Sequence, residues 1–178
     1  MSRVRQALPG VRQPRADSAD LSGVISVREA RLDEESEIET LFEILDAYAR
    51  GPGGQNAPLP EEARANLGAG LRAHPNAFVL FGELDGRVVG AAVCVYSFST
   101  FTGRPSLNLH DFSVLPSVQG SGVGTALLQE MEARARRRGA SKLTLEVHDT
   151  NEGAKRLYRR FGFEGWESQT LFVSKSLL

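Results

Sequence analysis

The stretch Leu115-Pro116-Ser117-Val118-Gln119-Gly120-Ser121-Gly122-Val123-Gly124-Thr125 places three alternating glycines between a strand-like run and a helix-like run. Glycine has no Cβ, so this backbone can turn sharply and point successive N–H groups outward. The N–H groups in the first turn of a helix have no internal acceptor, and the helix dipole is positive there. A phosphate or another anion is the natural guest of such a turn. The alternative is a tight turn with a purely structural role, and three alternating glycines favour the anion site.

The chain on either side of this stretch alternates between helix-like and strand-like patterns. Immediately upstream of the glycines, we expect a strand over 107–115. Downstream, we expect a helix from the glycines to about 138, a strand over 142–147, a short helix over 151–161 and a last strand or two within 163–174. Toward the N-terminus, we expect a strand over 24–30, two helices, and a hairpin of strands 76–84 and 87–99 around Asp85-Gly86. Gly139 is a good left-handed stop for the long helix.

Composition predicts one mixed α/β domain over residues 23–178, preceded by a disordered arm over residues 1–22. The formal net charge of −1 disfavours a nucleic-acid partner, which usually requires a basic excess. No apolar run is long enough to span a membrane. The single cysteine, Cys94, excludes an internal disulfide, offers no metal cluster, and is expected to be a small core residue. We expect a cytoplasmic protein.

Two common phosphate-binding patterns fit the glycine stretch poorly. A P-loop requires Gly-Lys before its Ser or Thr, and Gly124 is followed directly by Thr125. A dinucleotide site expects its third glycine at the position of Thr125 and an acidic residue about twenty positions later, near Glu146. That fold also builds a larger parallel sheet than the remaining chain allows. A dinucleotide site is therefore the weaker interpretation.

The pattern Gln119-x-x-Gly122-x-Gly124, preceded by Val114-x-Pro116, resembles the coenzyme A signature of the GNAT superfamily of N-acetyltransferases. The resemblance is close from Leu107 to Phe163 and extends to element order alone in the N-terminal half. Its further matches are Leu143–Val147, Asn151, Ala154, Tyr158 and Phe161-Gly162-Phe163. The resemblance implies a single central, mostly antiparallel sheet of six or seven strands, flanked by about four helices. Its central strands, 107–115 and 142–147, would splay apart.

The same resemblance implies acetyl-CoA as co-substrate and no metal. Its pyrophosphate would lie on the backbone N–H groups of Gln119, Gly120, Ser121, Gly122, Val123, Gly124 and Thr125. The pantetheine arm would pair with the main chain at Phe112 and Val114. Asn151 matches a position whose amide touches the pantetheine, although capping of the following helix explains it equally well.

The resemblance also implies that Tyr158 is the general acid, which protonates the departing thiolate. A phenol stays protonated at neutral pH and is a suitably weak donor. A packed core tyrosine is the alternative, and one side chain can do both. Candidates for the general base are His110 first and Asp111 second, where relatives often carry a glutamate. Alternation would place these two on opposite sheet faces. Water, or Glu146 and His148 on the neighbouring strand, would also serve.

The predicted function is transfer of an acetyl group from acetyl-CoA to a primary amine of a small molecule. A non-catalytic acyl-CoA-binding or sensor module on the same fold is the alternative, and a nucleotide-dependent oxidoreductase is a third. The helices before the hairpin and the loops 51–59 and 98–105 are expected to select the acceptor, with contributions from Asp46, Tyr48, Phe98, Phe101 and Arg104. The family's dimers imply a homodimer through 171–178.

A run of arginines closes the long helix, where cations suit the negative end of the dipole. It comprises Arg134, Arg136, Arg137 and Arg138. The alternative is a phosphate clamp, and the sequence favours a solvated helix face there.

Overall fold

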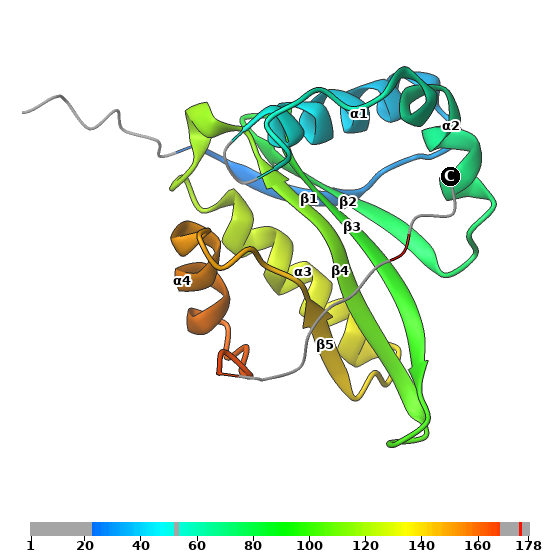
Figure 1. Ribbon diagram of the computed structural model, residues 1–178, viewed down its shortest axis with the longest axis vertical. Coiled ribbons are helices and arrows are strands. Elements are labelled where there is room, and N and C mark those ends of the chain that lie inside the picture. Colours follow the sequence, from blue (N-terminus) through cyan, green and yellow to red (C-terminus); the bar gives the residue numbers. More distant parts are fainter. Residues whose placement is uncertain (1–22, 52–53, 168–174, 176–178) are drawn as a thin grey trace, which may run out of the picture.

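A central β-sheet with helices on both faces organises the residues that the computed structural model describes, 23–51, 54–167 and 175 (Figure 1). The elements in chain order are β1 (Ile25–Glu29), α1 (Glu35–Arg50), α2 (Glu61–Arg72), β2 (Ala77–Leu84), β3 (Arg87–Ser99), β4 (Arg104–Val114), the 3₁₀ turn η1 (Pro116–Val118), α3 (Val123–Arg137), β5 (Lys142–Leu145) and α4 (Glu152–Arg160). The predicted arm at 1–22 and the predicted interface at 171–178 lie outside the described residues, apart from residue 175.

The sheet has the strand order β1-β2-β3-β4-β5. Each of the first four strands is antiparallel to its neighbour, and β5 runs parallel to β4. The mixed, mostly antiparallel architecture is confirmed, with five described strands instead of six or seven. Most of the predicted last strand or two falls outside the described residues, and the part that is described, 163–167, forms no strand.

The hairpin of β2 and β3 follows from its turn residues. Asp85 and Gly86 both have positive φ, +51° and +75°. Two-residue turns with this conformation match the right-handed twist of paired strands, which is why Asp-Gly favours them. The predicted hairpin is therefore confirmed.

Two apolar cores cover the two faces of the sheet. Consecutive residues of β2 belong to different cores. Leu80 packs in the cluster that contains Leu127 of α3, and Phe81 packs in the cluster that contains Leu41 of α1. All four side chains are fully buried or nearly so. A strand covered on both faces has a continuous apolar sequence because neither face meets water. Cys94 lies in the first core, as predicted, and burial raises the pKa of its thiol to about 12.

A pair of glycines sets where α3 begins. Gly82 of β2 pairs directly with Gly90 of β3. A Cβ added at Gly82 would lie only 2.6 Å from Cγ1 of Val123, and one at Gly90 would lie 3.3 Å from the same atom. Val123 is fully buried and is the first residue of α3. The first turn of α3 therefore rests directly on the sheet backbone.

The partners of β4 change in the middle of that strand. Val93 of β3 pairs with Asp111, and the next residue, Cys94, pairs with Leu109, so His110 is an extra residue in a β-bulge. On the other edge, pairing with β5 ends at Leu109. Its partner there, Leu145, is the last residue of β5, which ends two residues earlier than predicted. The part of β4 from His110 to Val114 therefore has no partner on this edge within the described ranges, and this part is the unpaired half of β4. A splay of the two strands stays a prediction.

A buried carboxylate ties β1 to α1. Glu37 of α1 accepts hydrogen bonds from the Arg28 guanidinium at 3.0 Å, from the Arg31 backbone N–H at 2.6 Å and from the Arg31 guanidinium at 2.9 Å. Burial by itself raises the pKa of this carboxyl, but the hydrogen bonds outweigh it and lower the pKa to about 2. The charged form is therefore the stabilising one.

We expect Glu37→Gln to lower the free energy of unfolding by about 2 kcal/mol at pH 7, because it removes charge-assisted hydrogen bonds from a buried site. The folded pKa lies below the unfolded value of about 4.3, so this contribution is present above that value and is lost as pH falls toward 2. Urea denaturation between pH 7 and pH 3 should show the difference between wild type and variant shrinking. Glu39→Gln, at an exposed pair with Arg64, should change stability by less than about 0.5 kcal/mol. A difference for Glu37→Gln that does not vary with pH contradicts the assignment.

Candidate functional site

A glycine-rich loop leads from the end of β4 into the first turn of α3. After η1, Gly120 (φ +88°) and Gly122 (φ +102°) take left-handed backbone conformations, and Gly122 is the N-cap of α3. Residues with a Cβ rarely adopt such angles, so the turn needs glycine at both positions. Nε2 of Gln119 donates to the Val114 carbonyl oxygen at 3.2 Å and ties the loop to the end of the strand.

The loop presents a row of backbone N–H groups that have no backbone acceptor within the described ranges. They belong to Gly120, Gly122, Val123, Gly124 and Thr125. The N–H groups of the first helical turn point along the axis toward the positive end of the helix dipole. Several donors converging at a positive helix end are suited to an anion with more than one oxygen, such as a pyrophosphate.

The Ser121 hydroxyl supports the same conclusion independently. It is buried, and it has no hydrogen-bond partner among the residues that the structure describes. A buried polar group left unpaired costs about 1–3 kcal/mol, so such groups are rare unless a ligand or water satisfies them. The loop thus fits a phosphate group through an orphaned side-chain donor as well as through its backbone.

Gly124 leaves bare backbone between two neighbouring elements. A Cβ at this position would lie 3.4 Å from Cδ2 of Leu157 on α4 and 3.5 Å from Cζ of Phe112 on β4. The first turn of α3, α4 and the half of β4 that has no partner on its β5 side therefore meet at Gly124. Val123 contributes only its backbone, since its side chain belongs to the core.

Asn151 caps α4. Its Oδ1 accepts the Ala154 N–H at 3.1 Å, so the capping interpretation of this residue is confirmed. The amide group can still donate through Nδ2, and contact with a pantetheine arm stays a prediction.

Tyr158 is the one buried residue of α4. Its ring packs against Phe112 at 6.0 Å between centroids and against Phe163 at 5.6 Å. Burial, with a smaller contribution from Tyr48, raises the pKa of the Tyr158 phenol well above its usual range. The phenol is therefore protonated at neutral pH and can act as a proton donor beside the unpaired half of β4.

His110 and Asp111 differ in their surroundings. His110 is exposed at the bulge, whereas Asp111 is partly buried. Burial raises the pKa of the Asp111 carboxyl, an effect that the neighbouring His110 partly offsets. The bulge breaks the simple alternation that the sequence predicted for this strand: Leu109 and Phe112 both pack in the core on the α3 side, three positions apart.

Tyr48 lies near the end of α1. Burial and the charge of Asp111 both raise the pKa of its phenol, and Tyr48 in turn raises the pKa of Tyr158. Tyr48 thus lies within electrostatic reach of Asp111 on β4 and of Tyr158 on α4.

Other residues predicted to select the acceptor lie elsewhere. The Asp46 carboxylate accepts from Arg50 at 2.6 Å and from the Leu59 N–H at 2.8 Å, so it holds the loop after α1. Phe98, Phe101 and Arg104 lie at the tip of the β3–β4 hairpin. Arg104 is six residues from His110 along the strand, about 20 Å. That distance removes the hairpin tip from the candidate site.

Sequence reasoning missed one feature of this region. The bulge at His110 has no local signal, because it depends on how β3 pairs with β4.

Within the described ranges, no group of three His, Cys, Asp or Glu side chains is arranged to hold a metal ion. No described helix has the length and apolar character needed to cross a bilayer.

Comparison with known proteins gives matches over most of the chain. The model of the acetyltransferase (GNAT) family matches residues 38–163. Thialysine N-epsilon-acetyltransferase of Mus musculus is 36% identical over 94 residues, which cover 49% of this chain and 55% of that protein. This chain therefore spans about half the length of that relative.

Two further matches extend over more of both chains. Glucosamine 6-phosphate N-acetyltransferase of Trypanosoma brucei brucei is 29% identical over 142 residues, which cover 79% of this chain and 92% of that protein. The crystal structure of a transcriptional regulator from Bacillus halodurans C-125 superposes with a TM-score of 0.71 at 18% identity, covering 86% of this chain and all of that one. At this identity the structural likeness concerns the fold alone.

Proposed function

Because this chain belongs to the acetyltransferase (GNAT) family, we propose that it transfers an acetyl group from acetyl-CoA to the primary amine of a small molecule. The observation that carries the proposal is the convergence at Gly124 of three parts: the loop of free N–H groups, the unpaired half of β4, and the helix that carries Tyr158. The loop would anchor the phosphates, the edge of β4 would hold the pantetheine arm, and Tyr158 would donate a proton at the far end of the bound cofactor.

The residues that would hold the cofactor follow from this path. The N–H groups of Gly120, Gly122, Val123, Gly124 and Thr125 and the Ser121 hydroxyl would bind the pyrophosphate. The N–H groups of Gln119 and Ser121 instead donate to the carbonyls of Pro116 and Val118. The main chain at Phe112 and Val114, beyond the last pair with β5, would bind the amide groups of pantetheine in the manner of an added strand. Bound acetyl-CoA supplies an activated acetyl group as a thioester, whose departing thiolate needs a proton.

Tyr158 would supply that proton. Its ring is held between those of Phe112 and Phe163, which fixes the position of the phenol. A raised pKa makes the phenol a weaker acid, but the same dry surroundings also raise the pKa of a thiol held next to it. The pKa of the phenol and the pKa of the thiol therefore rise together, and proton transfer between them stays feasible.

Asp111 would act as the base that receives the proton of the attacking amine, either directly or through water. Asp111 is partly buried, whereas His110 is exposed at the bulge. The negative charge of Asp111 also raises the pKa of Tyr48. A carboxylate here would also attract an ammonium substrate. The named substrates of the relatives, thialysine and glucosamine 6-phosphate, are small amines, which supports an acceptor of that class.

Asp111→Asn is expected to lower kcat/KM by about a hundredfold, the usual contribution of a general base. In wild type, activity should fall with decreasing pH through a pKa above the ordinary aspartate value, because burial raises it and the base must be ionised. The variant should lose this limb and keep the limb set by the amine itself. His110→Gln, one residue away, is the matched control. A wild-type pH profile in Asp111→Asn transfers the role to His110 or to water.

The first test of the proposal is calorimetric titration with acetyl-CoA, with NAD as the control. We expect saturable, micromolar binding of acetyl-CoA and no heat from NAD. Release of free thiol is then followed across a panel of small amines that includes lysine analogues and amino sugars. Binding without turnover on any amine favours a non-catalytic acyl-CoA-binding module, and binding of NAD alone favours an oxidoreductase.

A further inference from the structure

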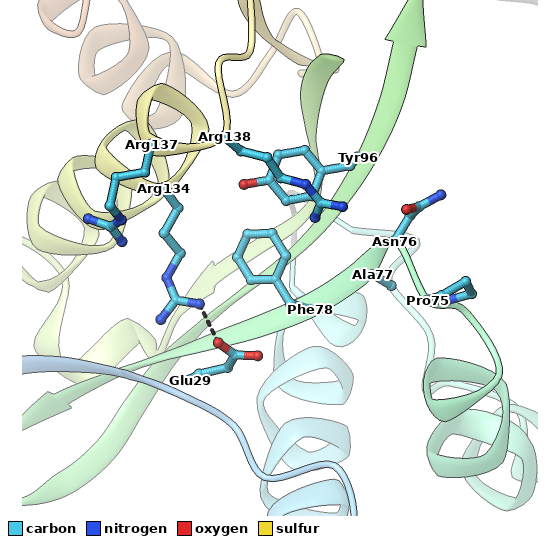
Figure 2. Close-up of a pocket in the computed structure, with 9 residues that line it drawn as sticks. All are labelled: Glu29, Pro75, Asn76, Ala77, Phe78, Tyr96, Arg134, Arg137 and Arg138. Atoms are coloured by element: carbon cyan, nitrogen blue, oxygen red, sulfur yellow. Dashed lines mark hydrogen bonds and ion pairs between the residues drawn. The ribbon is translucent and has the colours of Figure 1, made fainter.

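A cavity lies at the C-terminal end of α3, at the other end of that helix from the glycine-rich loop. Its volume is about 470 Å³, and Figure 2 shows its lining. Arg134, Arg137 and Arg138 project from the last turn of α3, opposite residues 75–77 at the start of β2. The fifteen residues of α3 separate this cavity from the loop by about 20 Å.

Two aromatic rings form the inner wall of the cavity. Phe78 of β2 and Tyr96 of β3 pack with their centroids 5.5 Å apart and inclined at 31°. The guanidinium of Arg134 lies over the Phe78 ring at 5.4 Å, and that of Arg138 lies over the Tyr96 ring at 4.2 Å. Stacking holds a guanidinium flat, which orients the N–H groups at its edge for paired hydrogen bonds with an oxyanion.

The charges around the cavity do not balance. Glu29 binds Arg134, and Glu130 binds both Arg134 and Arg137. Two carboxylates thus face three guanidinium groups. In the described part of the chain, no acidic side chain lies within salt-bridge distance of Arg138. The helix dipole offsets about half a charge, so a net positive charge remains at Arg138.

Capping of the helix does not account for the arginine side chains. The backbone already closes the end of α3, since Arg138, Gly139 and Ala140 donate their N–H groups to the carbonyls of Arg134, Arg136 and Ala135 at 3.1, 3.0 and 2.9 Å. Gly139 has φ +71°, the left-handed conformation of this motif. Arg136, Arg137 and Arg138 are exposed, as the sequence predicted. The same helix end also lines a cavity, in which Arg138 has no acidic partner among the described residues.

We propose that this cavity binds a small anionic metabolite through a carboxylate or phosphate group, with Arg138 as its main contact. The shared chemistry is an oxyanion that accepts two parallel N–H bonds from one guanidinium. Arg137 adds a second positive group at the rim, and Asn76 offers an amide on the opposite wall. A volume of this size is typical of sites for small molecules.

The test is calorimetric titration of the full chain with citrate and, separately, with inorganic phosphate at constant ionic strength. A saturable heat with citrate alone identifies a carboxylate ligand, and one with phosphate alone identifies a phosphate ligand. Arg138→Gln should weaken that binding about tenfold or more, the value of one charge-assisted pair. Arg138→Lys, which keeps the charge without the planar fork, should recover only part of it.

Arg136→Gln is the matched control because it removes the same charge from the same helix turn. Its side chain is 76% exposed, pairs with Glu132, and does not line this cavity. Repeating each titration with coenzyme A present separates the cavity from the glycine-rich loop, and if coenzyme A does not bind, the comparison of variants decides alone. No saturable heat, equal binding by wild type and Arg138→Gln, or loss of binding when coenzyme A is added overturns the proposal.

Discussion

Tyr158→Phe is expected to lower kcat by about two to three orders of magnitude while leaving the dissociation constant of acetyl-CoA within about twofold. The substitution removes only the phenolic oxygen, and a positioned general acid contributes about 10²- to 10⁴-fold. The ring contacts with Phe112 and Phe163 persist in phenylalanine, so α4 should pack as before. Steady-state kinetics with a saturating amine, beside a binding titration of acetyl-CoA, separate the two effects.

The pH dependence of this variant sharpens the result. The raised pKa of Tyr158 keeps the phenol protonated at neutral pH, so wild type should show no loss of activity from this group below pH 10. Tyr48→Phe is the control, since it removes a phenol from the same neighbourhood without touching α4. Turnover by Tyr158→Phe equal to that of wild type leaves Tyr158 as a packed core residue only.

Gly122→Val is expected to weaken coenzyme A binding by about 10- to 100-fold, which corresponds to the loss of one or two charge-assisted N–H bonds. A β-branched residue at φ +102° is strained, and its Cβ would lie 3.2 Å from Cδ1 of Ile25. Relief of that strain moves the first turn of α3, and the donors move with it. Calorimetric titration of coenzyme A into wild type and variant gives the ratio.

Gly86→Val is the matched control for strain. Gly86 also has a positive φ, +75°, and nothing lies within 4 Å of an added Cβ. It sits in the β2–β3 turn, so this variant should lose stability by about 1–3 kcal/mol and keep its affinity for coenzyme A. An unchanged affinity in folded Gly122→Val means that the loop is a structural turn.

The sequence predicted best where a short segment decides its own conformation. Asp85-Gly86 specified its hairpin, Gly139 ended α3, and the glycines at 120 and 122 adopted the backbone that positions free N–H groups. In each case the preference belongs to the residue itself and needs no distant partner. The order of elements followed from periodicity for the same reason.

Prediction failed where the outcome depends on elements that meet only in the folded chain. The bulge at His110 arises from pairing with β3, and the cavity at Arg138 exists because the end of α3 faces β2 and β3. Asp46 offers a carboxylate typical of an amine site, but Arg50 and the Leu59 N–H occupy it. Nothing local distinguishes a carboxylate that binds a ligand from one that holds a loop.

The close contact between Gly82 and Val123 bears on how this chain can change in laboratory evolution. Gly82 lies on β2, far along the sequence from the glycine-rich loop, yet any larger side chain there pushes directly on the first residue of α3. A mutant library that keeps only the loop residues constant would therefore still lose function through substitutions at Gly82, which lies outside the sequence motif. Saturation of position 82 should leave glycine almost alone among survivors, whereas open position 70 should accept many residues. Selection for the proposed coenzyme A site would therefore also restrict a strand position that does not itself contact the ligand.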